Sequence, residues 1–199
     1  MKHRPEQILD AAITLFDADG VGVSTANVAK AAGVSNGTLF NYFPSKQDLL
    51  DALYTRTKTD LAEAIGDIDP KLPIRDQVHL VWSRWLNCML DDLARNRVVR
   101  LLHQSGLASE DAVDRAMEAF AVPRRILEDA EAQGVLIDLP AEYLSALVQQ
   151  QLELVVEAQL DPALHDTAFD AMWKSITRAP HTEGVTSVSY THLTLPTKA

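Results

Sequence analysis

Apolar residues recur at spacings of three and four along almost the whole chain, and this periodicity limits the fold more than any other feature. Such spacing places apolar side chains on one face of an α-helix, whereas a half-buried strand would carry them at every second position. We find no convincing strand and no internal repeat, so the sequence predicts an all-α protein. The clearest stripe lies near the start of the chain, at Ile8, Ala11, Ala12, Leu15 and Phe16.

Prolines, glycines and capping residues divide the first part of this pattern into short helices. Pro5 suits a first helical turn, and Gly20 suits the position after a helix has ended. Two short helices are then expected, over 24–33 and 35–42. The sequence therefore predicts a three-helix unit at the start of the chain.

The rest of the chain is predicted to form longer helices. Ser45 and Asp48 resemble a capping box, with Asp in place of the usual Glu, and they open a fourth helix. The segment 66–73, rich in Asp and Pro, is the one plausible linker. Further helices are expected over 74–93, 109–133, 140–160 and 161–178.

The acidic charge is unevenly distributed. The 199 residues carry a net charge of -10. Residues 1–60 hold 6 basic and 7 acidic residues, whereas residues 61–178 hold 11 basic and 20 acidic residues. A near-neutral first segment can still present a local basic face to phosphates, although long-range attraction to nucleic acid will be weak. We therefore expect modest non-specific DNA binding and a need for good base contacts.

The composition excludes several classes of protein. With 47% hydrophobic residues, the chain suits a soluble globular protein with a real core. No long apolar run and no secretory signal is present, so we expect no membrane partner. A lone cysteine, Cys88, excludes an internal disulfide and a cysteine-built zinc site, and a reducing cytoplasm is the expected location. Without a phosphate loop, a zinc-protease motif or a nucleophile motif, we expect no enzyme, no catalytic residues, no metal and no cofactor.

Residues 24–46 have the pattern of a helix-turn-helix. The two short helices meet at Gly33, which can adopt the positive φ that a tight turn between helices needs. In this arrangement the second helix enters the major groove of DNA. The apolar positions fit it, with Val28 and Ala32 lining one helix, Leu39 the other, Val34 at the corner, and Ala29 small enough for close approach.

The outward residues of the second helix are of types that read DNA. Short polar side chains can contact base edges and phosphates, and Gly37 removes bulk where a DNA backbone could come near. The alternative is that these polar groups are merely solvated. The candidates are Ser35, Asn36, Thr38 and Asn41, with Thr25 and Lys46 at the starts of two helices placed for phosphates.

The spaced pattern over residues 5–55 resembles the DNA-binding domain of the TetR/AcrR family. The resemblance implies that Thr25, Tyr42 and Lys46 contact phosphates, although the Tyr42 ring could instead pack against the first helix. It also implies that the recognition helix comprises Ser35, Asn36, Gly37, Thr38 and Asn41. The pattern reads Val28-Ala29-x-x-Ala32-Gly33-Val34-Ser35-x-Gly37-Thr38-Leu39-x-x-Tyr42-Phe43-x-Ser45-Lys46-x-x-Leu49-Leu50.

Two positions depart from what is frequent in that family. Phe40 stands where many members have Tyr, so a phenolic hydroxyl bond to phosphate is absent. Asn36 stands where Lys is frequent, which exchanges a charge for a possible bidentate contact to adenine. Both departures predict weaker binding to the DNA phosphates and a greater dependence on direct base contacts.

A helix-turn-helix regulator that reads two half-sites needs a dimer interface. In the family that this chain resembles, the last two helices of each subunit form that interface. The alternative is that these apolar stripes are internal core. The candidates are Leu144, Leu147, Val148, Leu152 and Val155 on one helix, and Phe169, Met172, Trp173 and Ile176 on the other.

A pocket for an unidentified small-molecule effector is expected among the helices that span 74–135. An apolar cavity with a few convergent polar groups is typical of such sites, although a Trp/Met stripe is more often plain core. The acidic charge of this region favours a cationic or neutral lipophilic effector. The candidates are Trp82, Trp85 and Met89 on one face, with Arg100, His103, Met117 and Phe120 on an opposing wall.

These features predict a transcription regulator with a helix-turn-helix domain at 1–47 and a C-terminal ligand-binding and dimerisation bundle at 48–178. The prediction is a homodimeric repressor that binds a palindromic operator in double-stranded DNA and is released by the effector. The alternative is a DNA-bound adaptor whose C-terminal domain binds a protein. Residues 179–199 are expected to form a disordered tail, and 186–199 resemble translated sequencing-adapter read-through more than a native segment.

Overall fold

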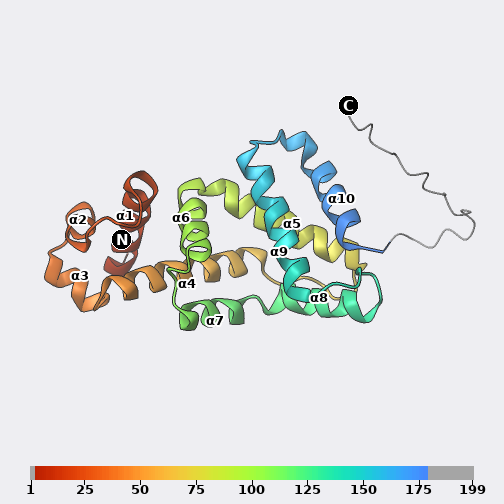
Figure 1. The fold of residues 1–199 in the computed structure, drawn as a ribbon, viewed down its shortest axis with the longest axis horizontal. Coiled ribbons are helices and arrows are strands. Elements are labelled where there is room, and N and C mark those ends of the chain that lie inside the picture. Colours follow the sequence, from red (N-terminus) through yellow and green to blue (C-terminus); the bar gives the residue numbers. More distant parts are fainter. Residues whose placement is uncertain (1–2, 179–199) are drawn as a thin grey trace, which may run out of the picture.

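The computed structural model describes residues 3–178, which form ten α-helices and one short 3₁₀ helix (Figure 1). The predicted all-α fold is therefore confirmed, whereas the predictions for residues 179–199 lie outside the described range. None of these helices is long and apolar enough to cross a membrane. In chain order they are α1 Arg4–Asp19, α2 Thr25–Ala31, α3 Asn36–Tyr42, α4 Lys46–Ile65, α5 Ile74–Asp91, α6 Leu93–Gln104, α7 Glu110–Ala119, α8 Ala121–Ala132, α9 Ala141–Glu157, η1 Pro162–Leu164 and α10 His165–Ile176.

The predicted caps of the first four helices are present. Ser24 accepts a hydrogen bond from the Asn27 backbone, which satisfies one of the free N–H groups at the start of α2. At the start of α4, Ser45 and Asp48 form a reciprocal capping box. Gly20 follows α1 with a φ of 79°, as its predicted position after the helix requires. The chain therefore starts and stops these helices by local chemistry.

The helix α4 joins the two ends of the molecule. In Figure 1 the small helices α1–α3 lie at one end, and α4 runs from them toward the helices of the larger bundle. The first half of α4 packs into a core shared with α1, α2, α3, α6 and α7, which we call the head core. Its buried residues include Ile8, Phe16, Val28, Leu39, Leu49, Leu53, Val98, Leu102 and Ala112.

The second half of α4 belongs to the bundle. Leu61 and Ile65 pack against α5 and α8 through Val81 and Ile126. A separate bundle core lies mainly between α5, α9 and α10. Its largest buried side chains include Trp82, Leu86, Leu144, Leu152, Phe169 and Met172.

The predicted single helix over 109–133 is wrong, because α7 and α8 are separated at Phe120. Pro123 has no N–H to donate to residue 119, and its ring would clash with that carbonyl in a continuous helix. Phe120 leaves the helical conformation, with φ -86° and ψ 33°, and its side chain is buried between the two helices and α4. A proline in the sequence was therefore the signal for this break.

The predicted helix over 74–93 also ends early. α5 stops at Asp91, and Asp92 accepts a hydrogen bond from the Arg95 backbone at 3.0 Å to start α6. Leu93, predicted to extend the stripe of the preceding helix, is instead an exposed first residue of α6. α6 crosses α4 (Figure 1), so the chain builds a bundle instead of one long rod.

Asp51 ties α4 to the start of α7. Its carboxylate accepts hydrogen bonds from the backbone N–H of Ser109 at 2.9 Å and from the Ser109 hydroxyl at 2.8 Å. Burial opposes ionisation of Asp51, but the bonds from Ser109 and Gln47 outweigh it and lower the pKa of this carboxyl. This contact fixes α7 beside the helix that leads to α1–α3.

We predict that Asp51→Ala lowers the free energy of unfolding by about 1–2 kcal/mol near neutral pH, because it leaves the Ser109 N–H without its acceptor. Chemical denaturation followed by circular dichroism measures the change. Since the folded pKa is depressed, the contribution is present above the ordinary Asp pKa of about 3.9 and is lost as pH falls through the lower folded value. Asp114→Ala, on the exposed side of α7, is the matched control. Equal stability of the Asp51 and Asp114 variants would contradict this role.

Candidate DNA-reading surface and effector cavity

The corner between α2 and α3 has the geometry of a helix-turn-helix. Gly33 adopts a φ of 68°, and the Val34 N–H donates to the Ala29 carbonyl at 3.0 Å. Val28 and Leu39 are completely buried, so they fix the angle between the two helices. The turn lies at the end of the molecule remote from α10 (Figure 1), which leaves α3 free of the bundle.

Most of the predicted reading residues are exposed on α3 or beside it. Within residues 3–178, the amides of Asn36 and Asn41 have no hydrogen-bond partner, so their donors and acceptors face solvent. Tyr42 is 46% exposed, and the neighbouring Phe43 enters the core in its place. Of the predicted set, Ser35, Asn36, Gly37, Asn41 and Tyr42 are exposed, and Thr25, Thr38 and Lys46 are partly buried.

Two features of α3 bear on how it could meet DNA. The hydroxyls of Ser35 and Thr38 lie 2.8 Å apart and share a hydrogen bond, while Ser35 also caps the Thr38 backbone. A Cβ atom on Gly37 would meet nothing closer than the Ser35 hydroxyl at 3.9 Å, so the packing of the chain itself does not demand glycine there. The two hydroxyls are thus pre-positioned, and Gly37 keeps the surface between Asn36 and Thr38 flat.

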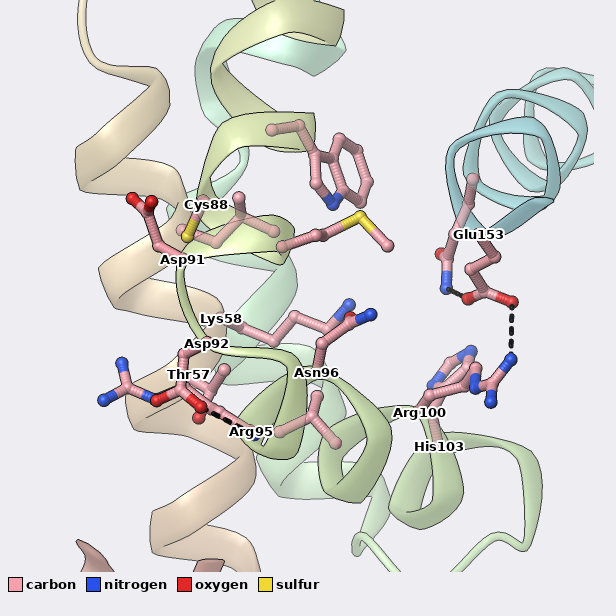
Figure 2. Close-up of a pocket in the computed structure, with 15 residues that line it drawn as sticks. Thr57, Lys58, Cys88, Asp91, Asp92, Arg95, Asn96, Arg100, His103 and Glu153 are labelled. Atoms are coloured by element: carbon pink, nitrogen blue, oxygen red, sulfur yellow. Dashed lines mark hydrogen bonds and ion pairs between the residues drawn. The ribbon is translucent and has the colours of Figure 1, made fainter. Parts of the chain in front are cut away.

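A cavity of about 330 Å³ lies between α4, α5, α6 and α9. Of the predicted effector contacts, Trp85, Met89, Arg100 and His103 line it. Figure 2 shows His103 and Arg100 on α6 facing Glu153 on α9 across this space. Small-molecule sites typically have volumes of about 300–1,000 Å³ and a largely apolar lining, so this cavity is at the small end of that range.

Three predicted effector residues do not line this cavity. Trp82 is 2% exposed and packs in the bundle core against Phe169, with ring centroids 6.0 Å apart. Phe120 is buried behind the cavity wall, 5.7 Å from the Trp85 ring. Met117 is 58% exposed on α7. The predicted stripe on α5 is therefore split: Trp85 and Met89 line the cavity, whereas Trp82 belongs to the bundle core.

The cavity contains polar residues that sequence patterns did not single out. Lys58 comes from α4, Asn96 from α6, and Gln149 and Glu153 from α9. Glu153 is only 6% exposed and accepts hydrogen bonds from Gln149 at 3.0 Å and Gln150 at 3.3 Å. A Glu in the middle of an apolar stripe, within Leu152-Glu153-Leu154-Val155, was the one signal in the sequence for an inward-facing carboxylate.

His103 connects the cavity to α4. Its Nδ1 lies 3.1 Å from the Tyr54 hydroxyl, and the two rings are stacked with centroids 6.1 Å apart. Burial and the nearby Lys58 ammonium lower the pKa of His103, so the imidazole is held in its neutral form at pH 7. Burial raises the pKa of Tyr54. This neutral pair joins α6 to the residues of α4 that support the head core.

Most residues of the predicted dimer stripes are buried within the chain itself, and the dimer interface stays a prediction. α9 and α10 pack their apolar faces against each other and against α5, so these faces present little surface to a partner. Leu147, Val148 and Trp173 are only partly buried. The six side chains buried within the chain itself are Leu144, Leu152, Val155, Phe169, Met172 and Ile176.

The outward sides of the same helices carry other apolar residues. Tyr143 and Leu154 on α9 are 53% and 55% exposed, and Leu164 beside α10 is 46% exposed. Within the described residues, no group of His, Cys, Asp or Glu side chains is arranged to hold a metal ion.

A pair of short helices with a buried corner, an exposed polar second helix and a separate bundle defines a helix-turn-helix DNA-binding protein. Residues 8–53 match the family model described as bacterial regulatory proteins, tetR family. The chain is a DNA-binding transcriptional regulator of the TetR family. This family consists of regulatory proteins, in agreement with the prediction that the chain is not an enzyme.

Relatives share different amounts of the chain. The fatty acid metabolism regulator protein of Bacillus subtilis is 28% identical over 156 residues, which are 76% of this chain and 79% of that protein. The nucleoid occlusion factor SlmA of Actinobacillus pleuropneumoniae is 43% identical over 68 residues, but these cover only 33% of this chain and 34% of SlmA.

Solved structures show the same fold over most of the chain. A TetR family transcription regulator from Marinobacter aquaeolei aligns with a TM-score of 0.78 and 17% identity, covering 88% of this chain and 96% of that one. The fatty acid degradation regulator FadR from Bacillus halodurans aligns with a TM-score of 0.69 and 17% identity, over 87% and 96% of the two chains. The arrangement of helices is therefore common to proteins of very different sequence.

Two substitutions on the α3 surface should have different effects. Lys46→Ala removes a charge placed for phosphate, so we expect weaker binding to all DNA sequences alike and a salt dependence shallower by about one counterion. Asn41→Ala removes an unpaired amide, so we expect a loss of about 1–3 kcal/mol on the preferred site only and relaxed preference at one base. Fluorescence anisotropy with preferred and scrambled duplexes, over a salt series, measures both.

The control for these variants is Lys71→Ala, which removes an exposed lysine from the linker between α4 and α5. It should leave binding unchanged. If Asn41→Ala weakened preferred and scrambled duplexes equally, Asn41 would not read a base.

Proposed function

We propose that this regulator is a ligand-responsive repressor, which binds a palindromic operator as a homodimer and is released when a small molecule enters the α4–α5–α6–α9 cavity. The observation that carries the proposal is that α4 contributes to both parts. Leu49, Leu50 and Leu53 are buried in the head core, while Thr57, Lys58 and Leu61 line the cavity on the same helix. At about 1.5 Å per residue, the two sets are separated by only one or two turns.

A ligand in the cavity would therefore act directly on α4, the helix that holds α1–α3, which we call the reading head. Helix backbones are stiff, so a shift of α4 against α5 and α6 moves α1–α3 as a unit. The effector must bind more tightly to the arrangement that does not fit DNA. A coupling of about 1–3 kcal/mol, typical of allosteric proteins, changes operator affinity roughly 5–150-fold.

The dimer places two α3 helices on successive major grooves, about 34–36 Å apart. The outward face of α9 and the neighbouring η1 are the best candidates for the contact, since Tyr143, Leu154 and Leu164 are exposed there. Large exposed apolar side chains grouped on neighbouring elements commonly mark protein interfaces. In such an interface the residues buried inside the chain support the contacting face without touching the partner.

The alternative, a DNA-bound adaptor for a protein partner, has less support. A filled bundle would favour it, but this bundle holds a cavity lined by polar and apolar groups. The similarity to SlmA spans a third of that protein, whereas the similarity to the Bacillus subtilis metabolic regulator spans 79% of its length. The longer match favours a regulator of metabolism over an occlusion factor.

Selection of bound DNA from a random pool tests the DNA half of this proposal. We expect a palindromic sequence whose half-site centres are one helical turn, or a small multiple of it, apart. Sedimentation of the protein on the selected duplex gives the number of chains bound. A non-palindromic site occupied by a single chain would reject the homodimer, and failure to enrich any sequence would reject operator recognition.

A further inference from the structure

Lys58 is a cation on the wall of the cavity without a counter-ion. Figure 2 shows its side chain extending from α4 into the space between α4 and α9, beside Asn96. Within residues 3–178, no carboxylate lies within 4.0 Å of its ammonium group. The Nζ atom instead lies 5.8 Å from the ring centroids of Tyr54 and Phe120. Aromatic rings stabilise a cation, but they do not neutralise it.

The two arginines that line the cavity already have acidic partners. Arg95 lies 3.0 Å from Asp60 and 3.2 Å from Asp92. Arg100 pairs with Glu157 and lies 4.0 Å from Glu153. Lys58 is therefore the cation of this cavity that has a charge left for a ligand.

Glu153 is the acidic group that most affects Lys58. Burial lowers the pKa of Lys58, and the charge of Glu153 opposes that shift. Glu153 already accepts hydrogen bonds from Gln149 and Gln150 and faces Arg100, so its charge is shared among several donors. Asp91, the remaining acidic residue of the wall, is exposed at the cavity mouth. An ammonium group taken partly out of water without a direct partner is costly, and an anion at hydrogen-bond distance would remove that cost.

The wall next to Lys58 is apolar. Leu61 comes from the same helix, Trp85 and Met89 face it from α5, and Val99 closes the side formed by α6. A ligand of this cavity would thus place one polar end at Lys58 and an uncharged body against these four side chains. The volume of about 330 Å³ limits that body to a small molecule.

We propose that the effector of this cavity is a small amphiphilic monocarboxylate, whose carboxylate ion-pairs with Lys58 and whose apolar body packs on Trp85, Met89 and Leu61. The inference rests on the proposed effector role of the cavity and names the chemical class of the ligand. It reverses the expectation from net charge, which favoured a cationic or neutral effector. The acidic side chains that make the net charge negative are mostly on the surface or paired, whereas the unpaired group on the cavity wall is basic.

The test compares three forms of the same molecule: 4-phenylbutyrate, 4-phenylbutanamide and 4-phenylbutylamine. A second set, decanoate, decanamide and decylamine, replaces the aromatic body with an alkyl chain. Calorimetry without DNA measures binding to the full chain. We expect at least one carboxylate to bind about tenfold or more tightly than its amide and its amine, because only the carboxylate gains a charge-assisted bond to Lys58.

Variants assign that preference to Lys58. Lys58→Met keeps the length of the side chain and removes the charge, so the carboxylate and the amide should bind about equally. Lys58→Arg should retain the preference, and Lys174→Met, the same change at an exposed site on α10, should leave it intact. Thermal unfolding checks each variant, and the comparison of the three analogues on the unchanged protein needs no variant at all.

The inference is overturned by equal binding of the three analogues, by a preference for the amines, or by a carboxylate preference that survives in Lys58→Met. Failure of both carboxylates to bind at about 1 mM, the weakest affinity of practical use, overturns it too. Operator affinity is measured separately with the selected duplex. A carboxylate that binds through Lys58 without changing operator affinity would support the anion site and reject the effector role.

Discussion

The burial of α4 in two different cores is the constraint on which the rest of the structure depends. Its first half packs with α1–α3, and its second half packs with α5 and α8. Closely packed interiors resist gradual deformation, so a change at one end of a shared helix is transmitted and not absorbed. The contact of Asp51 with Ser109 and the pairing of Tyr54 with His103 add α7 and α6 to the same unit. The reading head is thereby attached to the cavity.

The cavity has a charge character that differs from that of the whole chain. The net charge of -10 is a sum over the whole chain, in which exposed and paired side chains count equally. Inside, Arg95 and Arg100 have acidic partners, whereas Lys58 has none among the described residues. Because electrostatic interactions strengthen where water is excluded, one unpaired, partly buried charge outweighs many solvated surface charges in choosing a ligand. This is why composition and cavity point to ligands of opposite charge.

The DNA-reading end could be predicted almost completely from the sequence, and the bundle could not. Caps at Ser24, Ser35 and Ser45 and the turn at Gly33 depend on neighbours within a few residues, so spacing is sufficient evidence. In the bundle, apolar stripes show that a helix face is buried but not what buries it. Leu152 and Phe169 therefore suited a partner subunit as well as they suited the chain's own core, and the structure shows both buried within the chain.

Except for α6 and the break between α7 and α8, the sequence alone determined the helices, most of their ends and the polar surface of α3, because these follow from periodicity, capping and turn conformation over short distances. The tertiary structure decided which residues share the cavity. Lys58 and Glu153 are 95 positions apart, and no local pattern links them. They line one cavity because α6 crosses α4 and α9 lies on the far side of the same space. Sites built from distant helices depend on packing angles, which are set by the sum of many contacts and by no single motif.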